Sequence, residues 1–70
     1  MKKLKMFGTI KWYKDNKGYG YILGADEETY YFEILDCIKA YKSLTEGEVV
    51  KFIPHIGDFD YATEVEKEER

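Results

Sequence analysis

The residues with the clearest chemical potential lie between Lys11 and Ile22, where the chain reads KWYKDNKGYGYI. Four aromatic residues and three lysines occur within these twelve positions. An aromatic ring offers a flat face on which a nucleobase can stack, and a nearby ammonium group attracts a phosphate. Aromatic and basic residues at this density indicate a surface that binds a flat, anionic ligand.

Residues that catalyse reactions or bind metals are sparse. Cys37 is the only cysteine and His55 the only histidine, so they cannot supply the four ligands of a structural zinc site. The glycines of KGYGYI have the spacing of a strand, not that of a phosphate-binding loop. Asp26, Glu27 and Glu28 fall in a turn-like stretch and indicate solvated charge. We therefore expect no enzyme activity, no metal, no other cofactor and no small-molecule substrate.

Length and charge favour one small domain. The chain has 70 residues and a net charge of −3, but its first 21 residues contain six lysines and a single acidic residue, Asp15. A basic face can therefore exist on an acidic protein, and a ligand responds to that local field. The lone cysteine indicates a reducing compartment, and no stretch resembles a signal peptide or a membrane span. We expect a cytoplasmic monomer without membrane contact, with a domain over 1–66 and a charged, frayed end over 67–70.

Short strands separated by turns must position the aromatic side chains. Stretches rich in aromatic and β-branched residues, bounded by turn residues, predict strands over 7–13, 17–23, 29–34, 48–53 and 61–66. A helical turn followed by a loop is expected within 35–44, and a loop over 54–60. No 3.6-residue apolar period competes with this assignment. The sequence predicts an all-β fold, a small five-stranded antiparallel barrel.

Alternation along these strands separates core residues from surface residues. Successive side chains of a strand point to opposite faces, so Tyr19 and Tyr21 share one face and glycines occupy the other. Tyr31 falls beside these tyrosines when the opposite face of its strand is buried. A barrel this small cannot enclose both faces, so we expect these three tyrosines to be exposed. The expected core residues are Ile10, Ile22, Tyr30, Phe32, Val50 and Phe52.

KWYKDNKGYGYI resembles the first signature of the cold-shock domain, which usually contains Lys-Trp-Phe-Asn followed by Lys-Gly-Phe-Gly-Phe-Ile. The stretch TYYFEI lies where that family has Asp-Val-Phe-Val-His-Phe. YKSLTEGEVVKF is similar to its Phe-Lys-Ser-Leu-x-Glu-Gly-Gln-x-Val-x-Phe segment, and YATEV lies where the family has Gln-Ala-Ala-Asn-Val. The resemblance extends over about residues 7–65 and implies a five-stranded OB-fold barrel.

This resemblance also implies a function, namely the binding of single-stranded RNA or DNA. Its members act as RNA chaperones and as regulators of transcription or translation, often during adaptation to cold. Carried over by position, the implied contact residues are Lys11, Trp12, Lys17, Tyr19, Tyr21, Tyr31 and Tyr41. Lys11 and Trp12 are adjacent, so both can face the ligand only if the strand bulges there.

Several residues depart from the family pattern near the expected binding surface. Glu33 replaces the histidine of the second motif, Ile34 replaces its second aromatic residue, and Asp58 lies near a position that is often basic. Glu33 therefore belongs to the candidate site as a carboxylate that faces the ligand. We expect binding by base stacking, weaker than is typical of the family. The alternative is a protein-interaction module on the same barrel, in which exposed tyrosines bind a proline-rich or basic peptide.

Overall fold

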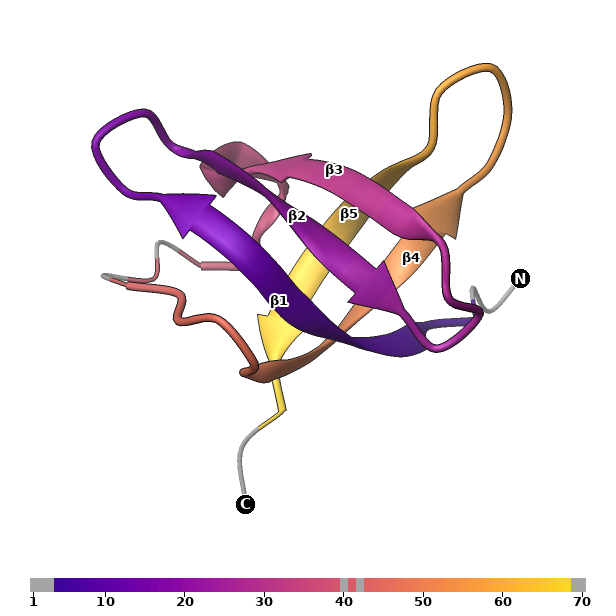
Figure 1. Cartoon of the computed structure of the whole chain (residues 1–70), viewed down its shortest axis with the longest axis horizontal. Coiled ribbons are helices and arrows are strands. Elements are labelled where there is room, and N and C mark those ends of the chain that lie inside the picture. Colours follow the sequence, from indigo (N-terminus) through magenta and orange to yellow (C-terminus); the bar gives the residue numbers. More distant parts are fainter. Residues whose placement is uncertain (1–3, 40, 42, 69–70) are drawn as a thin grey trace.

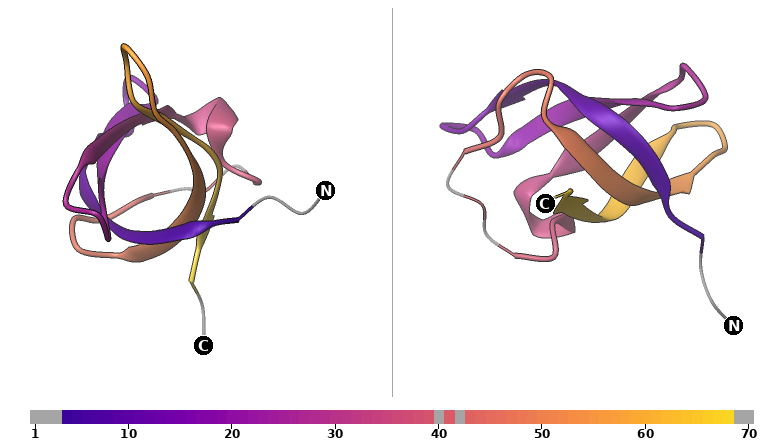
Figure 2. Two further views of the ribbon diagram at one scale, coloured as in Figure 1. Left: turned by 90° about the vertical axis from the view of Figure 1, so that its right-hand side faces the viewer. Right: turned by 90° about the horizontal axis from the view of Figure 1, so that it is seen from below.

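The computed structural model describes residues 4–39, 41 and 43–68. Its elements are β1 (Met6–Lys14), β2 (Tyr19–Gly24), β3 (Thr29–Glu33), the 3-10 helix η1 (Ile34–Asp36), β4 (Val49–His55) and β5 (Tyr61–Lys67). The strands close into a barrel in the order β1-β2-β3-β5-β4 (Figure 1). The left view of Figure 2 looks along this barrel, and the strands there form a ring.

The predicted five-stranded all-β barrel of the OB type is confirmed. One junction differs from a purely antiparallel arrangement, because β3 and β5 pair in parallel, with Tyr31 opposite Tyr61. The other four strand pairs are antiparallel. The parallel junction joins segments that are far apart in the sequence and places the start of β5 beside the outer face of β3.

All five strands are confirmed with ends within two residues of the predicted ones, and β1 is one residue longer at each end. Backbone hydrogen bonds explain the differences at the start of β2 and the end of β3. The backbone N–H groups of Lys17 and Gly18 both donate to the carbonyl of Lys14, at 3.0 and 2.7 Å, and Gly18 has a φ of 74°. This tight turn places Lys17 outside the strand, so β2 begins at Tyr19. The third strand ends at Glu33, since the N–H of Ile34 donates to the Gly18 carbonyl and Ile34 begins η1. The expected helical turn therefore starts one residue early.

The fourth and fifth strands are longer than predicted. Pro54 pairs with Ala62 and His55 with Tyr61, so β4 continues into the expected loop. At the other end, β5 runs to Lys67, and the N–H of Glu68 donates to the Val49 carbonyl at 3.0 Å. The loop expected within 35–44 also includes Ala40 and Lys42, which lie outside the described residues.

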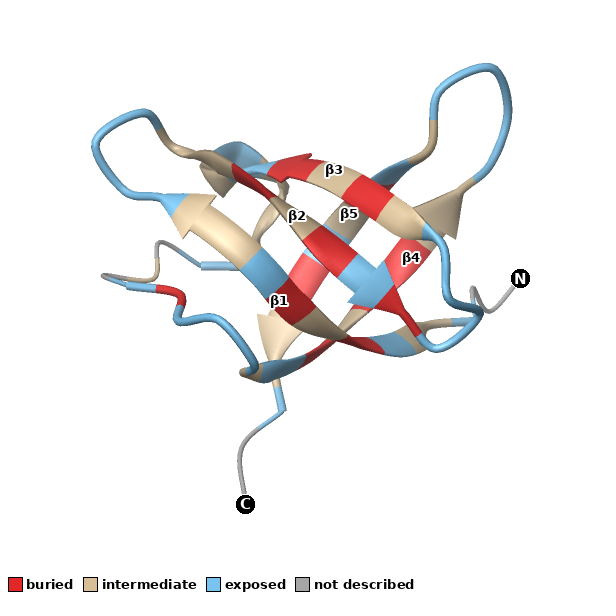
Figure 3. Cartoon of the chain, in the orientation of Figure 1, coloured by how far each residue is buried: buried red, intermediate tan, exposed pale blue. Residues whose placement is uncertain are grey.

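The core is formed by the inward side chains of all five strands, and Figure 3 shows buried positions alternating with more exposed ones along β2 and β3. The six predicted core residues are all at most 1% exposed. Leu44, Ile53, Ala62 and Val65 complete the core. The buried hydroxyl of Tyr30 donates to a carboxylate oxygen of Asp26 at 2.6 Å, which satisfies the one polar atom of this large core side chain.

A bulge in β1 gives the aromatic residues their positions. The register with β2 shifts between Ile10, which pairs with Ile22, and Trp12, which pairs with Tyr21. Ile10 is buried, Lys11 is exposed and Trp12 is partly exposed. The next residue, Tyr13, turns back to the core. Two successive side chains, Lys11 and Trp12, can therefore lie outside the barrel, as a β-bulge permits.

Gly20 is required by the close approach of β1 and β2 at this bulge. A Cβ atom on Gly20 would collide with the backbone carbonyl oxygen of Trp12 and would lie 2.9 Å from the Cα of Tyr13. Both neighbours are backbone atoms, which cannot move aside as a side chain can. Gly20 thus permits the strand spacing that places Trp12 next to the tyrosines of β2.

Candidate nucleic-acid interface

Aromatic side chains from three neighbouring strands meet on the outer face of the barrel. The strand register places Trp12 opposite Tyr21 and Tyr21 opposite Tyr31. The ring centroids of Trp12 and Tyr21 are 5.2 Å apart, and those of Tyr21 and Tyr31 are 5.6 Å apart. Tyr19 lies 5.6 Å from Trp12 and 5.9 Å from Tyr31. All four residues are partly exposed, so their rings remain accessible to a ligand.

Two more aromatic residues, which were not predicted to belong to the site, extend this group beyond β3. The Phe59 ring lies 5.6 Å from Tyr31, and Tyr61 lies 6.2 Å from Phe59 in a nearly parallel orientation. The parallel β3–β5 junction brings them here from the β4–β5 loop and the start of β5. We name the rings of Trp12, Tyr19, Tyr21, Tyr31, Phe59 and Tyr61 the aromatic surface.

The sequence contains a signal that could have identified this extension. Phe59-Asp60-Tyr61 alternates aromatic and polar residues, as Tyr19-Gly20-Tyr21 alternates aromatic residues with a glycine. Tyr61 also stands where the family's Gln-Ala-Ala-Asn-Val segment begins with glutamine. Behind it, the His55 ring stacks on Tyr61 at 4.5 Å with 3° between the planes, and its Nε2 lies 2.7 Å from the Thr63 hydroxyl. These contacts fix the orientation of the Tyr61 ring.

Basic residues flank the aromatic surface on the β1 side. Lys11 and Lys14 are on β1 and Lys17 is in the β1–β2 turn; the ammonium group of Lys14 lies 5.8 Å from the centroid of the Trp12 ring. Within the described part of the chain, none of these three lysines forms an ion pair. Lysines on β4 and β5 form ion pairs instead. Lys51 lies 3.4 Å from Glu66, and Lys67 lies 3.3 Å from Glu48.

Acidic residues lie on the β3–β5 side of the same surface. The Tyr31 hydroxyl donates to Oε2 of Glu33 at 2.8 Å, and the backbone N–H of Glu33 donates to Oδ2 of Asp36 at 2.9 Å. The hydrogen bond to Glu33 raises the pKa of Tyr31. Asp58 and Asp60 flank Phe59 in the sequence and are exposed and partly exposed, respectively. The aromatic surface therefore has a basic side and an acidic side.

An open pocket of about 330 Å³ lies at the acidic side. Its lining residues are Tyr31, Glu33, Asp36, Phe59 and Tyr61. Three of them contribute aromatic rings and two contribute carboxylates. A planar ligand that donates hydrogen bonds suits this lining better than a phosphate does, because a carboxylate only accepts hydrogen bonds and repels anions.

Tyr41 is the one implied contact residue that the structure does not bring to the aromatic surface. Its hydroxyl accepts a hydrogen bond from the backbone N–H of Lys67 at 2.9 Å, and its ring packs against the core. The ammonium groups of Lys67 and Lys39 lie 5.2 and 5.7 Å from the centre of this ring. Tyr41 is thus engaged with β5, whereas the other implied aromatic residues contact one another.

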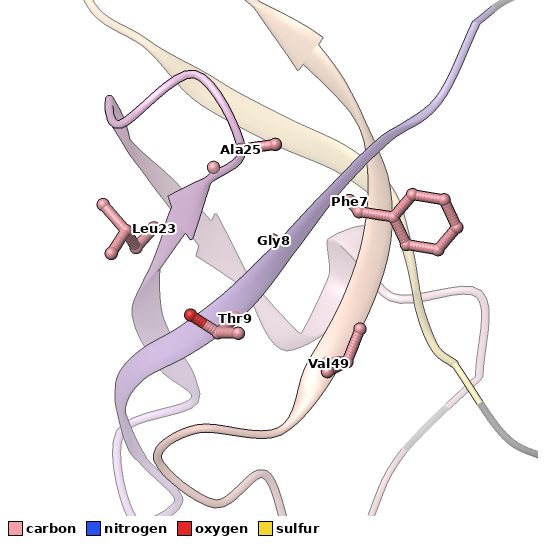
Figure 4. A pocket seen from close by; sticks show the side chains of 7 residues that line it. Phe7, Gly8, Thr9, Leu23, Ala25 and Val49 are labelled. Atoms are coloured by element: carbon pink, nitrogen blue, oxygen red, sulfur yellow. The ribbon is translucent and has the colours of Figure 1, made fainter.

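A second pocket, of about 290 Å³, lies between β1, β2 and β4 and is mainly apolar. Figure 4 shows Phe7, Leu23 and Val49 around it, with Thr9 on β1 between them. All three apolar side chains are exposed. Because this pocket contains no member of the aromatic surface, its residues offer controls for substitutions at the candidate site.

The side chains of Cys37 and His55, which could in principle take part in catalysis, are held by contacts within the fold. Cys37 is partly buried, and desolvation raises the pKa of its thiol to about 11, so it stays protonated at neutral pH. His55 is engaged by Tyr61 and Thr63. Residues 4–39, 41 and 43–68 contain no group of three or more histidine, cysteine or acidic side chains suited to a metal ion. In the same part of the chain, no helix is long and apolar enough to cross a membrane.

Comparisons with known proteins identify relatives of this chain. The model of the "'Cold-shock' DNA-binding domain" family matches residues 6–67. The cold shock protein CapA of Pseudomonas fragi is 38% identical over 53 residues, which cover 71% of this chain and 81% of CapA. The cold shock protein CapB of Pseudomonas syringae pv. tomato is 40% identical over 48 residues, covering 66% of this chain and 68% of CapB.

Proposed function

Because the chain belongs to the cold-shock domain family, which implies binding of single-stranded nucleic acid, we propose that it binds single-stranded RNA or DNA on the aromatic surface and acts as an RNA chaperone. The observation that carries this proposal is the continuity of six aromatic rings, from Trp12 on β1 to Tyr61 on β5, with centroids 5.2–6.2 Å apart. Successive bases can stack on such a series of rings.

Stacking supplies most of the binding free energy in this proposal. One base on one aromatic ring contributes about 1–3 kcal/mol. Lys11, Lys14 and Lys17 add attraction for phosphates at the basic side, where no described acidic residue pairs with them. With few phosphates neutralised, affinity falls only moderately with salt, by a slope of about −0.7 per contact on a single strand. The aromatic surface is complete in one chain, which supports binding as a monomer.

Chaperone activity follows from selectivity for unpaired bases. In a duplex the bases are already stacked and their edges are paired, so the aromatic surface cannot reach them. A protein that binds only the open form of a weak hairpin shifts the equilibrium toward that form by mass action. This mechanism consumes no ATP and uses no catalytic group. It suits regulation of transcription or translation, including in the cold, when weak RNA hairpins persist.

A fluorescence assay of hairpin opening tests this function. A short RNA hairpin with a weak stem carries a fluorophore and a quencher at its two ends, and a hairpin with a longer stem serves as control. We expect fluorescence to rise with protein concentration, without ATP, for the weak hairpin only. The double variant Tyr19→Ala/Tyr31→Ala should need a higher concentration. Binding of single strands without hairpin opening would reject the chaperone role and leave single-strand binding standing.

The alternative function is recognition of a basic peptide. It is favoured by the carboxylates of Glu33 and Asp36 beside the rings of Phe59 and Tyr61, since a cation can contact both an aromatic face and a carboxylate. Lys11, Lys14 and Lys17 on the other side of the surface, which form no ion pair with a described residue, would repel such a peptide. A nucleic acid accounts for both the rings and these lysines, so we place it first.

A further inference from the structure

We propose that the aromatic surface ends in a subsite for a single guanine base, in the pocket lined by Tyr31, Phe59, Tyr61, Glu33 and Asp36. The inference rests on the proposed function and deepens it, because it assigns a base preference to one end of the surface. Membership of the family does not imply this base preference. Glu33 replaces the family's histidine, and Phe59 and Tyr61 are not among the contact residues that the resemblance implies.

The walls of the pocket are flat and accessible. Phe59 is 58% exposed and Tyr61 is 39% exposed, and their planes differ by only 21°. Tyr31 closes the pocket on the side of β3, with its centroid 5.6 Å from Phe59. The stacking of His55 on Tyr61 holds one wall in place before a ligand arrives. A pocket of about 330 Å³ with these walls has room for one planar base.

The carboxylate of Glu33 determines which edge of a base fits. Its Oε2 accepts a hydrogen bond from the Tyr31 hydroxyl, and the side chain also accepts one from the backbone N–H of Asp36 in the capping box at the start of η1. An ionised carboxylate offers about four acceptor positions, so about half of this capacity is free. Among the described residues, no lysine or arginine lines the pocket. The group that completes the site must therefore donate hydrogen bonds and carry no negative charge.

Among the bases, guanine presents the best complement to a carboxylate. Its Watson–Crick edge places two donors side by side, the N1–H and the 2-amino group, which match the two carboxylate oxygens. Cytosine and adenine place one amino group beside an acceptor nitrogen, and uracil places its single N–H between two carbonyl oxygens. In a single strand this edge is unpaired and free to bind. Hydrogen bonds to a charged acceptor are also stronger than neutral ones.

The charge distribution also fixes where the guanine lies relative to its strand. The carboxylates of Glu33 and Asp36 repel phosphates at the pocket, while the lysines on the β1 side attract them. A guanine in the pocket thus lies at one end of the bound segment, and the phosphates lead from it toward β1. An arginine side chain could also stack and donate to Glu33, but it would not use the remaining rings or the lysines.

Titration of Trp12 fluorescence with a set of RNA heptamers tests this subsite. The set contains an all-uracil heptamer, variants with one guanine at each position in turn, and the same variants with inosine, which lacks the 2-amino group. We expect guanine at one terminal region to raise affinity roughly tenfold over uracil, the effect of one well-placed bidentate pair, and inosine to lose most of this gain.

Two variants and one control assign the effect to the pocket. Glu33→Gln keeps the size of the side chain and removes its charge, so the ratio of guanine to uracil affinity should fall to about one, because the amide donates as well as accepts. Phe59→Ala should reduce the same ratio by removing a wall. The matched control is Glu27→Gln, which removes the same charge in the exposed turn between β2 and β3, and the ratio should persist in it.

Each other outcome overturns the inference in a distinguishable way. If the all-uracil heptamer binds but no position favours guanine, the subsite is rejected and the proposed function stands. If no heptamer binds, both fail together. If a capped tetra-arginine peptide binds more tightly than the best guanine heptamer, and Glu33→Gln abolishes that binding, the pocket accepts a guanidinium group of a protein instead of a base.

Discussion

The hydroxyl of Tyr31 donates a hydrogen bond to the carboxylate of Glu33 at 2.8 Å. This bond links a member of the aromatic surface to the sharpest departure from the cold-shock pattern, where that family has a histidine. The tyrosine is thereby held at the edge of the acidic pocket, and the carboxylate is held next to the rings on which bases stack. A negative charge thus lies within the surface proposed to bind a polyanion.

Replacing this carboxylate by the family's residue should strengthen binding of pyrimidine strands. We predict that Glu33→His raises affinity for an all-uracil heptamer, because the imidazole can stack and no longer repels phosphates. Removing one exposed charge at a few ångströms is worth about 1 kcal/mol in water, and salt screens it. The gain should therefore be larger at low salt. Calorimetric titrations at two salt concentrations measure this gain, with Glu27→His as control. If Glu33→His and the parent protein bind with equal affinity at low salt, Glu33 does not lie on the path of the bound strand.

Loss of a single ring from the centre of the aromatic surface should weaken binding without unfolding the domain. We predict that Tyr19→Ala and Tyr31→Ala each cost about 1–3 kcal/mol of binding free energy, the value of one stacked base. The matched control is Phe7→Ala, which removes an exposed ring at the separate apolar pocket. Calorimetry with one oligonucleotide compares the three variants. Unchanged affinity in a folded Tyr31→Ala variant would refute the site assignment.

The opposite face of β3 should govern stability instead of binding. Phe32 is fully buried and stacks with Tyr13 at 5.7 Å, so Phe32→Ala removes a large core side chain. We predict a loss of about 3–5 kcal/mol in the free energy of unfolding, which a domain of this size cannot easily tolerate. Leu35→Ala, at a position 89% exposed, should have little effect. Urea denaturation compares the two, and similar midpoints would show that the faces of β3 are reversed.

Alkaline pH should destabilise the fold through groups that are buried in their neutral form. Desolvation raises the pKa of Cys37 from 9.0 to about 11 and also raises that of Tyr30. Their folded-state pKa values lie above the unfolded ones, so the stabilisation is fully present below the unfolded pKa and is lost as pH rises through the folded one. The free energy of unfolding should therefore decline between about pH 9 and 11 for Cys37.

The variant Cys37→Ala isolates the thiol's share of this decline. Urea denaturation across the same pH range should give a shallower dependence for Cys37→Ala than for the parent protein. The remaining slope at the upper end of the range belongs to Tyr30 and to the partly buried Tyr13, since desolvation raises the pKa of both. Identical slopes for the two proteins would mean that the thiol is as exposed in the folded chain as in the unfolded one.

Local patterns predicted the parts of the structure that depend on neighbouring residues. The alternation in β2 and β3 placed Tyr30 and Phe32 inside and Tyr19 and Tyr31 on the outer face, because the period of a strand is fixed by its geometry. Because Lys11 and Trp12 are adjacent, exposure of both side chains predicted a bulge. The register shift between Ile10 and Trp12 in β1 confirms it. The β1–β2 turn moved the start of β2 from Lys17 to Tyr19, since two N–H groups in the turn bond to one carbonyl.

Features that depend on distant segments could be predicted only in part, since the alternation in Phe59-Asp60-Tyr61 indicates a shared face but not the strand that lies beside it. Phe59 and Tyr61 join the aromatic surface because β3 and β5 pair in parallel, a contact between residues far apart in the chain. Tyr41 has the residue type of a binding position, but a hydrogen bond from the Lys67 backbone turns it toward β5. Tertiary contacts of this kind decide where a side chain lies, and the sequence pattern around the residue does not contain them.

The most direct test of base stacking on the aromatic surface is a titration of Trp12 fluorescence with a short single strand and with a duplex of the same sequence, at about 50 mM and about 200 mM salt. Trp12 is the only tryptophan and lies within the surface, 5.2 Å from Tyr21, so a stacked base should quench it. We predict saturable quenching by the single strand at both salt concentrations, with only a moderate loss of affinity, and little quenching by the duplex. No quenching by any single-stranded heptamer up to high micromolar concentrations, or equal quenching by the duplex, would contradict the account.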